Sequence, residues 1–534
     1  MIRIAGLRLS LEESEDKLSG LVVKKLGIKA SDLRKLVIFK QSIDARTRKT
    51  LSFVYTVDVE VRDESFVISR HNDPNIVVAP QLRYEAVKTG SEPLKEPPVI
   101  IGTGPAGLFA GVFLAEMGYR PLLLERGDDI ETRAKKVQTF WDRGELDDGS
   151  NVQFGEGGAG TFSDGKLTTL IKDPRCRKVL EDLVAAGGPP EILYSFRPHI
   201  GSDILRKVVK NLRRRIRDLG GAVQFRSQVT DFTVEHGRIT GVIINDKVPL
   251  ACQAVILAVG HSARDTFKRL CERNLTMTAK PFSIGVRIEH PQEWINKAQY
   301  KEFAGHPRLG PADYKLSCHL TNGRSAYTFC MCPGGMVVAA ASQEGGVVTN
   351  GMSFHARDGA NANSALLVGV TPEDFAGSHF LAGMEFQQTW ERAAFELGNG
   401  AYQAPCQLAG DFLQGRPSAR LGIVKPTYPR GVVPGDLAGC LPRYVIDTLQ
   451  KALRDFDRKL PGFAHEEALM TGVETRSSSP VRLLRRDNHE SSIEGLYPAG
   501  EGAGYAGGIV SAAVDGLRTA EALARRFRPL NAAK

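Results

Sequence analysis

The chain has 534 residues, of which 42% are hydrophobic and 25% charged, and 70 Lys and Arg against 61 Asp and Glu give a formal net charge of +9. This length predicts several domain-sized units, and the composition is that of a globular enzyme. The charge excess is mild and no long basic tract is present, so nucleic acid is not an expected partner. Eight scattered cysteines without C-x-x-C spacing form no disulfide framework and disfavour zinc, and we expect no metal site.

Neither the N-terminus nor any internal segment predicts a membrane protein. The first run, MIRIAGLRLSLEE, turns acidic before an apolar core of signal-peptide length accumulates. The uncharged stretch from Val99 to Ala115 is broken by five glycine or proline residues into strand, turn and helix. We therefore expect a cytoplasmic protein.

Residues 1–90 are predicted to form a small α/β module, and residues 91–98, with three prolines, a linker. The elements expected in the module are a strand at Ile2 to Leu9, a helix with Leu18, Leu21, Val22 and Leu26 on one face, and strands at Lys35 to Ser42 and Leu51 to Val61.

A glycine fingerprint follows the linker. Gly102, Gly104 and Gly107 form G-x-G-x-x-G directly after a strand and at the start of a helix, and Glu125 ends the next strand. These glycines permit a tight turn, close approach of a pyrophosphate and close helix–strand packing, while the acidic residue binds ribose hydroxyls. The adjoining residues Pro105, Ala106 and Arg126 complete this part of the expected cofactor site.

A second match to the glycine pattern, at Gly155, Gly157 and Gly160, lacks the preceding strand and the following apolar helix. It is therefore not a second Rossmann site. Two interpretations stay open: a loop whose backbone approaches a ligand, and a glycine-rich surface loop.

The middle of the chain alternates between helical and strand patterns. An amphipathic helix is predicted from about Ser202 to Asp218, with an arginine-rich face that we interpret as solvated. Alternation predicts a β-meander over residues 222–244 and a buried strand at Ala254 to Val259. The less regular region that follows is predicted to contain helices near residues 380–397 and 442–458.

Two further segments resemble the glutathione-reductase-type flavoproteins. AVILAVGHSARDTF contains a buried strand ending in Gly260, and GLYPAGEGAGYAGGIVSAAVDG contains a strand ending at Gly500. The resemblance implies that Glu501, where many members have Asp, holds the ribityl chain of FAD. The helix that starts near Gly507 and Gly508 could direct its N-terminal dipole at the flavin.

Taken together, GTGPAG, FGEGGAGTFSDGKL, HSARDTF, FCMCPGG, TNGMSFHARDGANANSALLV, ETRSSSPVR and GEGAGYAGGIVSAAVDG resemble a bacterial family described as uncharacterised FAD-dependent dehydrogenases. This resemblance spans nearly the whole chain and implies non-covalent FAD and a separate cap, but no known substrate. The expected fold is α/β, with a Rossmann-like FAD-binding domain of the glutathione reductase type at 99–270 and 471–534. An excursion is inserted near 130–200, an α+β cap or substrate domain lies at 271–470, and the α/β module precedes them.

Three groups of residues are candidates for catalysis. Lys166 could hydrogen-bond the flavin or an anionic substrate, although an exposed lysine is the commoner outcome. Arg476 and Arg482 could hold a substrate carboxylate or form an ion pair between domains. Cys332, with Cys330 two residues before it, could form a redox pair, although free cysteines are often simply buried.

Isolated histidines such as His290 and His355 are possible proton donors but are more often structural. The leading hypothesis is an FAD-dependent dehydrogenase or reductase acting on a small molecule, for which an anion is a candidate, with NAD(P)H as a candidate transient electron donor. The alternatives are an FAD-dependent RNA-modifying enzyme and a non-catalytic FAD-binding redox sensor. The sequence names neither the substrate nor the oligomeric state.

Overall fold

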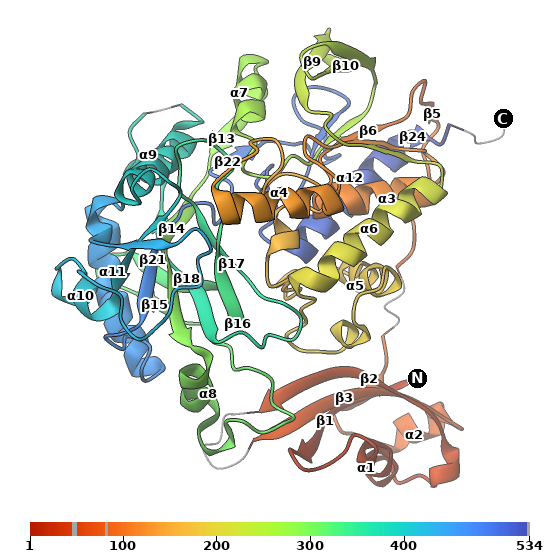
Figure 1. Cartoon of the computed structure of the whole chain (residues 1–534). Helices are drawn as coiled ribbons and strands as arrows, with labels where there is room; N and C mark the ends of the chain where they lie inside the picture. The colour runs from red at the N-terminus through yellow and green to blue at the C-terminus, as the bar shows by residue number, and fades with distance from the viewer. Residues whose placement is uncertain (45–50, 81–83, 378, 531–534) are drawn as a thin grey trace.

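The computed structural model describes residues 1–44, 51–80, 84–377 and 379–530. These residues form an N-terminal module, a nucleotide-binding domain and a cap (Figure 1). The module lies at the bottom of Figure 1 in red, the cap at the left and the nucleotide-binding domain at the upper right.

The N-terminal module is a four-stranded antiparallel sheet in the order β2-β3-β1-β4. Its predicted elements are present as β1 (Ile2–Ser10), α1 (Lys17–Leu26), β2 (Leu33–Asp44) and β3 (Ser52–Val61), and α2 (Glu64–Arg70) and β4 (Ile76–Val78) complete it. Every second residue of β3 is buried, so one face of the sheet packs against α1.

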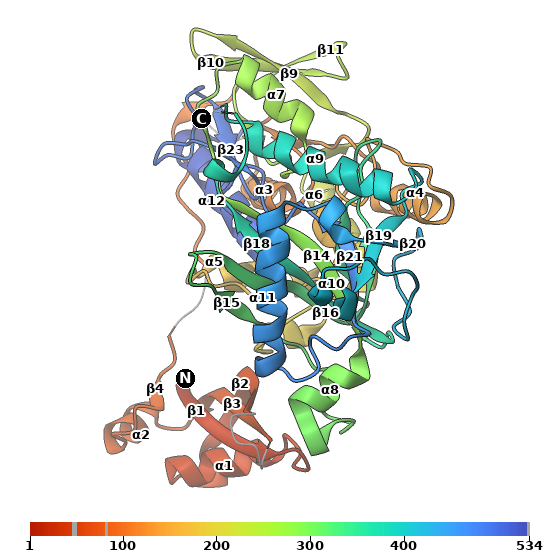
Figure 2. The same ribbon diagram turned by 90° about the vertical axis from the view of Figure 1, so that its left-hand side faces the viewer.

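Backbone hydrogen bonds attach this module to the rest of the chain. The Gln41 amide donates to the Tyr194 carbonyl at 2.8 Å, and the Phe196 amide donates to the Gln41 carbonyl at 2.9 Å. Arg308 of the cap donates to the Leu11 carbonyl at 2.9 Å. The module therefore contacts both other units, below which it lies in Figures 1 and 2.

The nucleotide-binding domain is built on a five-stranded parallel sheet in the order β23-β12-β6-β7-β8. The strands are β6 (Val99–Ile101), β7 (Leu122–Leu124), β8 (Ala222–Gln224), β12 (Val255–Leu257) and β23 (Leu496–Pro498). One face packs against α3 (Pro105–Glu116), α5 (Arg175–Ala185), α6 (Ser202–Asp218) and α12 (Ile509–Arg526). This strand order and helix cover define a Rossmann-like fold.

The structure divides the meander predicted over residues 222–244. Residues 222–224 form β8, which follows α6 and joins the parallel sheet beside β7, because a strand–helix–strand crossover returns the chain to the same sheet. The meander itself consists of β9 (Val229–Glu235), β10 (Arg238–Ile244) and β11 (Val248–Ala251). With α7 (Arg264–Glu272), it covers the second face of the sheet.

The two segments that flank the nucleotide-binding domain in the sequence pair with each other. In the region expected to be a linker, β5 (Glu92–Pro93) pairs in parallel with β24 (Phe527–Arg528), and β24 directly follows α12.

The excursion after β7 begins with α4 (Ile130–Arg143). β13 (Met277–Ala279) and β22 (Val481–Leu483) pair beside the junction with the cap.

The cap is an eight-stranded mixed sheet with the order β15-β16-β18-β14-β21-β19-β20 and β17 paired to β16. Its strands are β14 (Phe282–Pro291), β15 (Ser317–His319), β16 (Ser325–Ala339), β17 (Thr349–Met352), β18 (Asn361–Val370), β19 (Ala404–Leu408), β20 (Val432–Pro434) and β21 (Leu469–Glu474). Because β21 lies inside this sheet, between β14 and β19, the cap sheet extends past residue 470.

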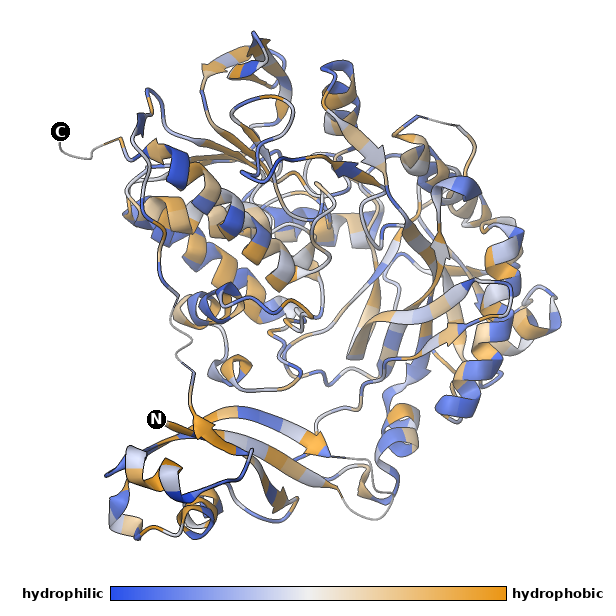
Figure 3. Ribbon diagram, turned by 180° about the vertical axis from the view of Figure 1, so that it is seen from behind, coloured by the Kyte–Doolittle hydropathy of each residue, from blue (hydrophilic) through white to orange (hydrophobic). Residues whose placement is uncertain are grey.

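Four helices accompany the cap sheet: α8 (Gln292–Tyr300), α9 (Ala382–Leu397), α10 (Ala409–Gln414) and α11 (Arg443–Lys459). α9 and α11 are the two helices predicted for this region. α11 runs across the sheet in Figure 2 and buries an apolar stripe that includes Leu449 and Phe456. Figure 3 shows the same alternation of hydrophilic and hydrophobic residues on the outer helices. Within the described part of the chain, no helix is both long and apolar enough to cross a membrane.

Candidate cofactor site

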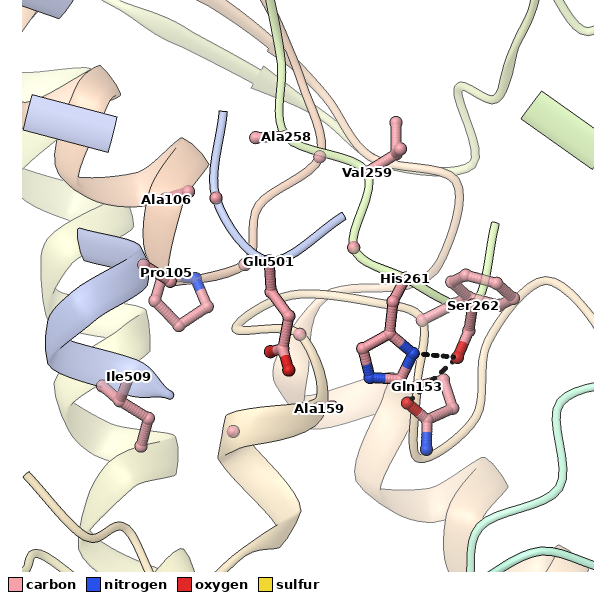
Figure 4. Close-up of a pocket in the computed structure, with 18 of the residues that line it drawn as sticks. Pro105, Ala106, Gln153, Ala159, Ala258, Val259, His261, Ser262, Glu501 and Ile509 are labelled. Carbon is pink, nitrogen blue, oxygen red and sulfur yellow. Dashed lines mark hydrogen bonds between the residues drawn. The ribbon is translucent and has the colours of Figure 1, made fainter. Parts of the chain in front are cut away.

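One cavity lies between the glycine turns of the nucleotide-binding domain and the cap sheet (Figure 4). The expected cofactor residues converge on it although they come from four separate segments. Those that line it are Gly102, Gly104, Pro105, Ala106, Glu125, Arg126, Gly260, Gly500, Glu501, Gly507 and Gly508. Of the expected cofactor residues, Gly107 is the one that does not line the cavity.

The first glycine turn has the geometry that a pyrophosphate needs. A Cβ at Gly102, whose φ is +98°, would lie 2.4 Å from the Ala258 carbonyl oxygen, and a Cβ at Gly107 would lie 2.0 Å from the Gly102 oxygen. These two glycines therefore pack strand and helix together. A Cβ at Gly104 would have only the Gly158 Cα, at 3.8 Å, as a protein neighbour. Gly104 leaves open space in front of the N-terminus of α3, where backbone N–H groups favour an anion.

Glu125 is buried in the cavity wall and accepts four hydrogen bonds from the protein. Its donors are the Thr103 amide at 2.9 Å, the Thr103 hydroxyl at 2.7 Å, the Gly127 amide at 2.9 Å and the Gly155 amide at 3.1 Å. The carboxylate thus holds three backbone segments around the first turn. A bound ribose would share these oxygens with the protein.

The second glycine-rich segment packs directly on the first turn. The Gly157 amide donates to the Thr103 carbonyl at 2.8 Å, and a Cβ at Gly158 would lie 3.0 Å from the Gly104 Cα. Gly155, Gly158 and Gly160 line the cavity. Of the two interpretations of this segment, the geometry supports a loop whose backbone approaches a ligand.

Arg133 on α4 fixes this loop and was not among the predicted residues. Its side chain is fully buried, and its guanidinium donates to five backbone carbonyls. The acceptors are Asn151 at 2.8 Å, Val152 at 2.9 Å, Gly155 at 3.3 Å, Glu156 at 2.7 Å and Gly158 at 3.0 Å. A planar group with five donors suits such a ring of acceptors, but no local sequence pattern predicts this role for Arg133.

Glu501 extends into the cavity in Figure 4, and its carboxyl makes no hydrogen bond to any residue that the structure describes. Burial raises the pKa of Glu501 to about 7; a negative charge on Cys330 acts in the same direction, and Lys280 opposes it. A carboxyl group with free oxygens on a cavity wall is suited to hydroxyl groups of a ligand, as expected for the ribityl chain. Gly507 and Gly508 precede α12 at the same wall.

His261, Ser262 and Gln153 form a polar part of the cavity wall, to the right of Glu501 in Figure 4. The Ser262 hydroxyl lies 3.4 Å from His261 Nδ1 and donates to the Gln153 side chain at 3.3 Å. Burial lowers the pKa of His261 to about 3, and Arg476 and Arg264 add to this shift. The imidazole is therefore neutral. The segment AVILAVGHSARDTF contains this histidine, but only the strand and Gly260 of that segment supported an expected role in the cofactor site.

Lys166 lies on the cavity wall at the boundary with the cap. Its ammonium group pairs with Asp164 at 2.8 Å and donates to the Met331 carbonyl. Asp164 is buried and also binds Arg357 at 2.6 Å, and the two cations hold the pKa of this carboxyl below its usual range against the effect of burial. Lys166 is therefore an oriented, partly buried cation and not a solvated surface lysine.

Arg476 also lines the cavity, but its guanidinium is bound to Glu391 at 2.9 and 3.0 Å and to the Ser342 hydroxyl. Of the two interpretations of Arg476, the geometry supports the ion pair. Arg482 lies on β22, is exposed and is outside the cavity, where it donates to the Gly504 carbonyl at 3.3 Å.

The remaining candidate residues, two cysteines and two histidines, differ in whether they line the cavity. Cys330 lines the cavity, whereas Cys332 is fully buried behind it. His290 is buried in the cap, and its Nε2 lies 2.7 Å from the Phe463 carbonyl, while His355 stacks on His199 away from the cavity. Both histidines have structural surroundings.

The arginine-rich face of α6 is divided between ion pairs and solvent, since Arg213 and Arg215 are paired while Arg214 and Arg217 are exposed. Arg213 lies 3.2 Å from Glu156 and 3.3 Å from Glu131, and Arg215 lies 3.0 Å from Asp182. This face contributes to packing of the nucleotide-binding domain as well as to its surface.

The cavity walls fit FAD. The open space at Gly104, in front of the N-terminus of α3, provides for a pyrophosphate. The N-terminus of α12 provides for a flavin edge, and the free carboxyl of Glu501 for a hydroxylated chain. The fold and the site together define a protein of the Rossmann-like dinucleotide-binding class with a cap over its cofactor.

Comparisons with known proteins agree with this class. Residues 281–477 match the family model described as FAD-dependent protein, C-terminal domain-like, residues 100–160 match an NAD(P)-binding Rossmann-like domain, and residues 1–60 match a domain of unknown function. A Clostridium beijerinckii (strain ATCC 51743 / NCIMB 8052) protein, described as uncharacterized, is 50% identical over 528 residues, covering 98% of this chain and 99% of its own. The chain therefore belongs to an uncharacterised family of FAD-dependent proteins, and FAD is its cofactor.

The chain is also similar to solved structures at low sequence identity. Glycine oxidase from Bacillus cereus ATCC 14579 is 11% identical, with 82% of this chain and 100% of that chain covered and a TM-score of 0.32. Glycerol-3-phosphate dehydrogenase from Bacillus halodurans, complexed with FAD, is 11% identical, with 80% of this chain and 64% of that chain covered and a TM-score of 0.34.

Proposed function

We propose that the protein is a dehydrogenase or reductase that binds FAD non-covalently and acts on a small anionic molecule held between the flavin and the cap sheet. The observation that carries this proposal is the position of Lys166, whose ammonium lies where the cofactor loops meet the cap. Two of its three N–H donors are used by Asp164 and Met331, so one remains for a ligand.

FAD supplies the capacity to accept or deliver a hydride or electrons. The side chains of the protein position the ligand and supply the positive charge that binds it. Asp164 orients Lys166, so the ammonium is held in place before an anion arrives. Phe329 and Asn350 from the cap strands β16 and β17 contribute the cap's part of the cavity wall.

Ligand binding tests the role of Lys166. Small mono- and dicarboxylates titrated into the FAD-loaded protein should perturb the flavin absorption spectrum, and Lys166→Met should weaken the response by roughly tenfold or more. Lys172→Met is the matched control because Lys172 is exposed and does not line the cavity. Equal responses in all three proteins would contradict the proposal.

Electron donors are tested by anaerobic rapid mixing with NADH and NADPH separately. Rapid bleaching of the flavin band supports a reductase that uses a transiently docked nicotinamide. A flavin that resists both donors but is reduced by a carboxylate or another small substrate supports a dehydrogenase. A flavin that none of these compounds reduces would contradict an enzymatic role.

A further inference from the structure

The segment Cys330-Met331-Cys332 forms a bulge in β16 at the cavity wall. The pairing of β16 with β18 shifts register between Phe329 and Cys332, and Cys330 has a φ of +43°, which non-glycine residues rarely adopt. A bulge redirects side chains relative to a regular strand. Here it places Cys330 on the cavity wall while Cys332 stays buried.

Three hydrogen bonds hold this bulge. Arg287 donates to the Cys330 carbonyl at 2.9 Å, Lys166 donates to the Met331 carbonyl, and the Cys332 thiol donates to the Cys330 carbonyl at 3.2 Å. Arg287 is itself fully buried and paired with Glu474 at 2.5 Å. The backbone strain is thus stabilised by side chains from other strands and loops, as at functional sites.

The two thiols differ in their electrostatic surroundings. Interaction with the Cys332 side chain and the positive charges of Arg287 and Lys166 lower the pKa of the Cys330 thiol against the effect of burial. Interaction with the Cys330 side chain and burial raise the pKa of the Cys332 thiol. A thiolate next to a thiol is the arrangement that forms and opens disulfides.

Other cysteines lack this arrangement. Cys406 and Cys440 are also buried in the cap, and burial raises the pKa of both thiols, Cys406 to about 12. Neither lines the cavity. Among the residues that the structure describes, Cys330 is the cysteine that combines a cavity position, two nearby cations and a second thiol.

We propose that Cys330 and Cys332 form a dithiol–disulfide couple that exchanges two electrons with FAD and passes them to or from a small dithiol or disulfide compound in the cavity. This inference rests on the proposed function, since it requires a redox-active flavin in the same cavity. Cys330 and Glu501 both line the cavity, so the thiol shares it with the flavin-side residues.

The electron exchange balances within the protein. The Cys330 thiolate and the Cys332 thiol would form one S–S bond as the Cys332 S–H bond breaks, which releases two electrons and one proton. FAD bound in the cavity would supply the capacity to take up those two electrons and that proton. A substrate dithiol then reduces the disulfide by thiol–disulfide exchange and leaves as a disulfide. The net reaction oxidises one dithiol and reduces one FAD.

The test compares FAD-loaded wild type with Cys330→Ser, Cys332→Ser and the control Cys406→Ser, a buried thiol of the same sheet. Dithiothreitol serves as the dithiol under anaerobic conditions. Wild type and control should show flavin bleaching at least about tenfold faster than either active-site variant. Dithionite titration of the fully oxidised proteins should consume twice as many electrons per FAD in wild type and control as in the two variants.

Two further readouts separate the possible failures. Photoreduction reports whether the flavin is redox-active without any thiol, and mass spectrometry of alkylated protein reports whether a 330–332 disulfide forms on oxidation. A flavin that photoreduces in every protein, with equal dithiothreitol rates and equal electron counts, overturns the thiol couple and leaves the proposed function standing. A flavin that cannot be reduced by light or dithionite overturns both.

Discussion

Arg264 of the nucleotide-binding domain forms a two-point ion pair with Glu391 of the cap, with N···O distances of 2.8 and 2.9 Å. Arg264 is the first residue of α7 and Glu391 lies on α9, so the pair joins the two units beside the cofactor cavity. Arg476 binds the same carboxylate, and all three side chains are buried. One carboxylate therefore neutralises two buried guanidinium groups.

Removing this carboxylate should destabilise the protein strongly. Glu391→Gln leaves two buried arginines without a counter-charge, and breaking a buried ion pair typically costs about 3–5 kcal/mol. Chemical denaturation of the apoprotein would measure the loss. Glu385→Gln, at an exposed position of the same helix, should change the free energy of unfolding by less than about 0.5 kcal/mol. Comparable stability of the two variants would show that the pair contributes little.

Gly104 and Gly107, the second and third glycines of the fingerprint, should respond differently to replacement by alanine. Gly104→Ala adds a methyl group into open space, so the apoprotein should keep its stability while the Kd for FAD rises by roughly tenfold or more. Gly107→Ala places the methyl group 2.0 Å from the Gly102 oxygen and should cost about 2 kcal/mol or more of stability. Fluorescence titration with FAD and thermal unfolding of the apoproteins distinguish the two effects.

The parts of the site that could be predicted are those encoded by neighbouring residues. A strand, a glycine turn and a helix appear together in the chain around Gly102, and the same pattern returns near Gly500, so both turns could be assigned to one parallel sheet edge. Arg133 and His261 gave no such signal, because their roles depend on carbonyls and charges from distant segments. Arg476 was expected to hold a substrate carboxylate or to form an ion pair between domains; it lines the cavity, but its partner Glu391 lies 85 residues away and no pattern connects them.

The stability of the fold should depend on pH through Glu156. Burial raises the pKa of this carboxyl from 4.5 to about 7, even though Arg213 lies 3.2 Å away and favours the ionised form. The folded state therefore binds the proton more tightly than the unfolded state. The resulting stabilisation is complete below about pH 4.5 and is lost as the pH rises through 7.

Glu156→Gln cannot ionise and should match wild type near pH 4 but exceed its free energy of unfolding by about 3 kcal/mol at pH 8. Urea denaturation at several pH values would give the difference curve. Glu145→Gln, at an exposed position, should show a flat curve. A Glu156→Gln curve that is also flat would mean that the carboxyl ionises normally in the folded protein.

Arg133 offers a test of whether the glycine-rich loop must be held in place for cofactor binding. Lysine has three donors and lacks the planar fork, so Arg133→Lys leaves at least two of the five loop carbonyls without a donor. Each buried unsatisfied group costs about 1–3 kcal/mol, and part of that cost should appear as weaker FAD binding because Gly155 and Gly158 line the cavity.

Equilibrium titration with FAD and hydrogen exchange across residues 151–158 would measure the two effects of Arg133→Lys. Faster exchange in this loop, together with a Kd raised roughly tenfold or more, is the expected result. Arg143→Lys is the matched control, since Arg143 is exposed on the same helix. If the loop exchanges faster while FAD binds as tightly as in wild type, the cofactor itself orders the loop on binding and Arg133 serves only the stability of the apoprotein.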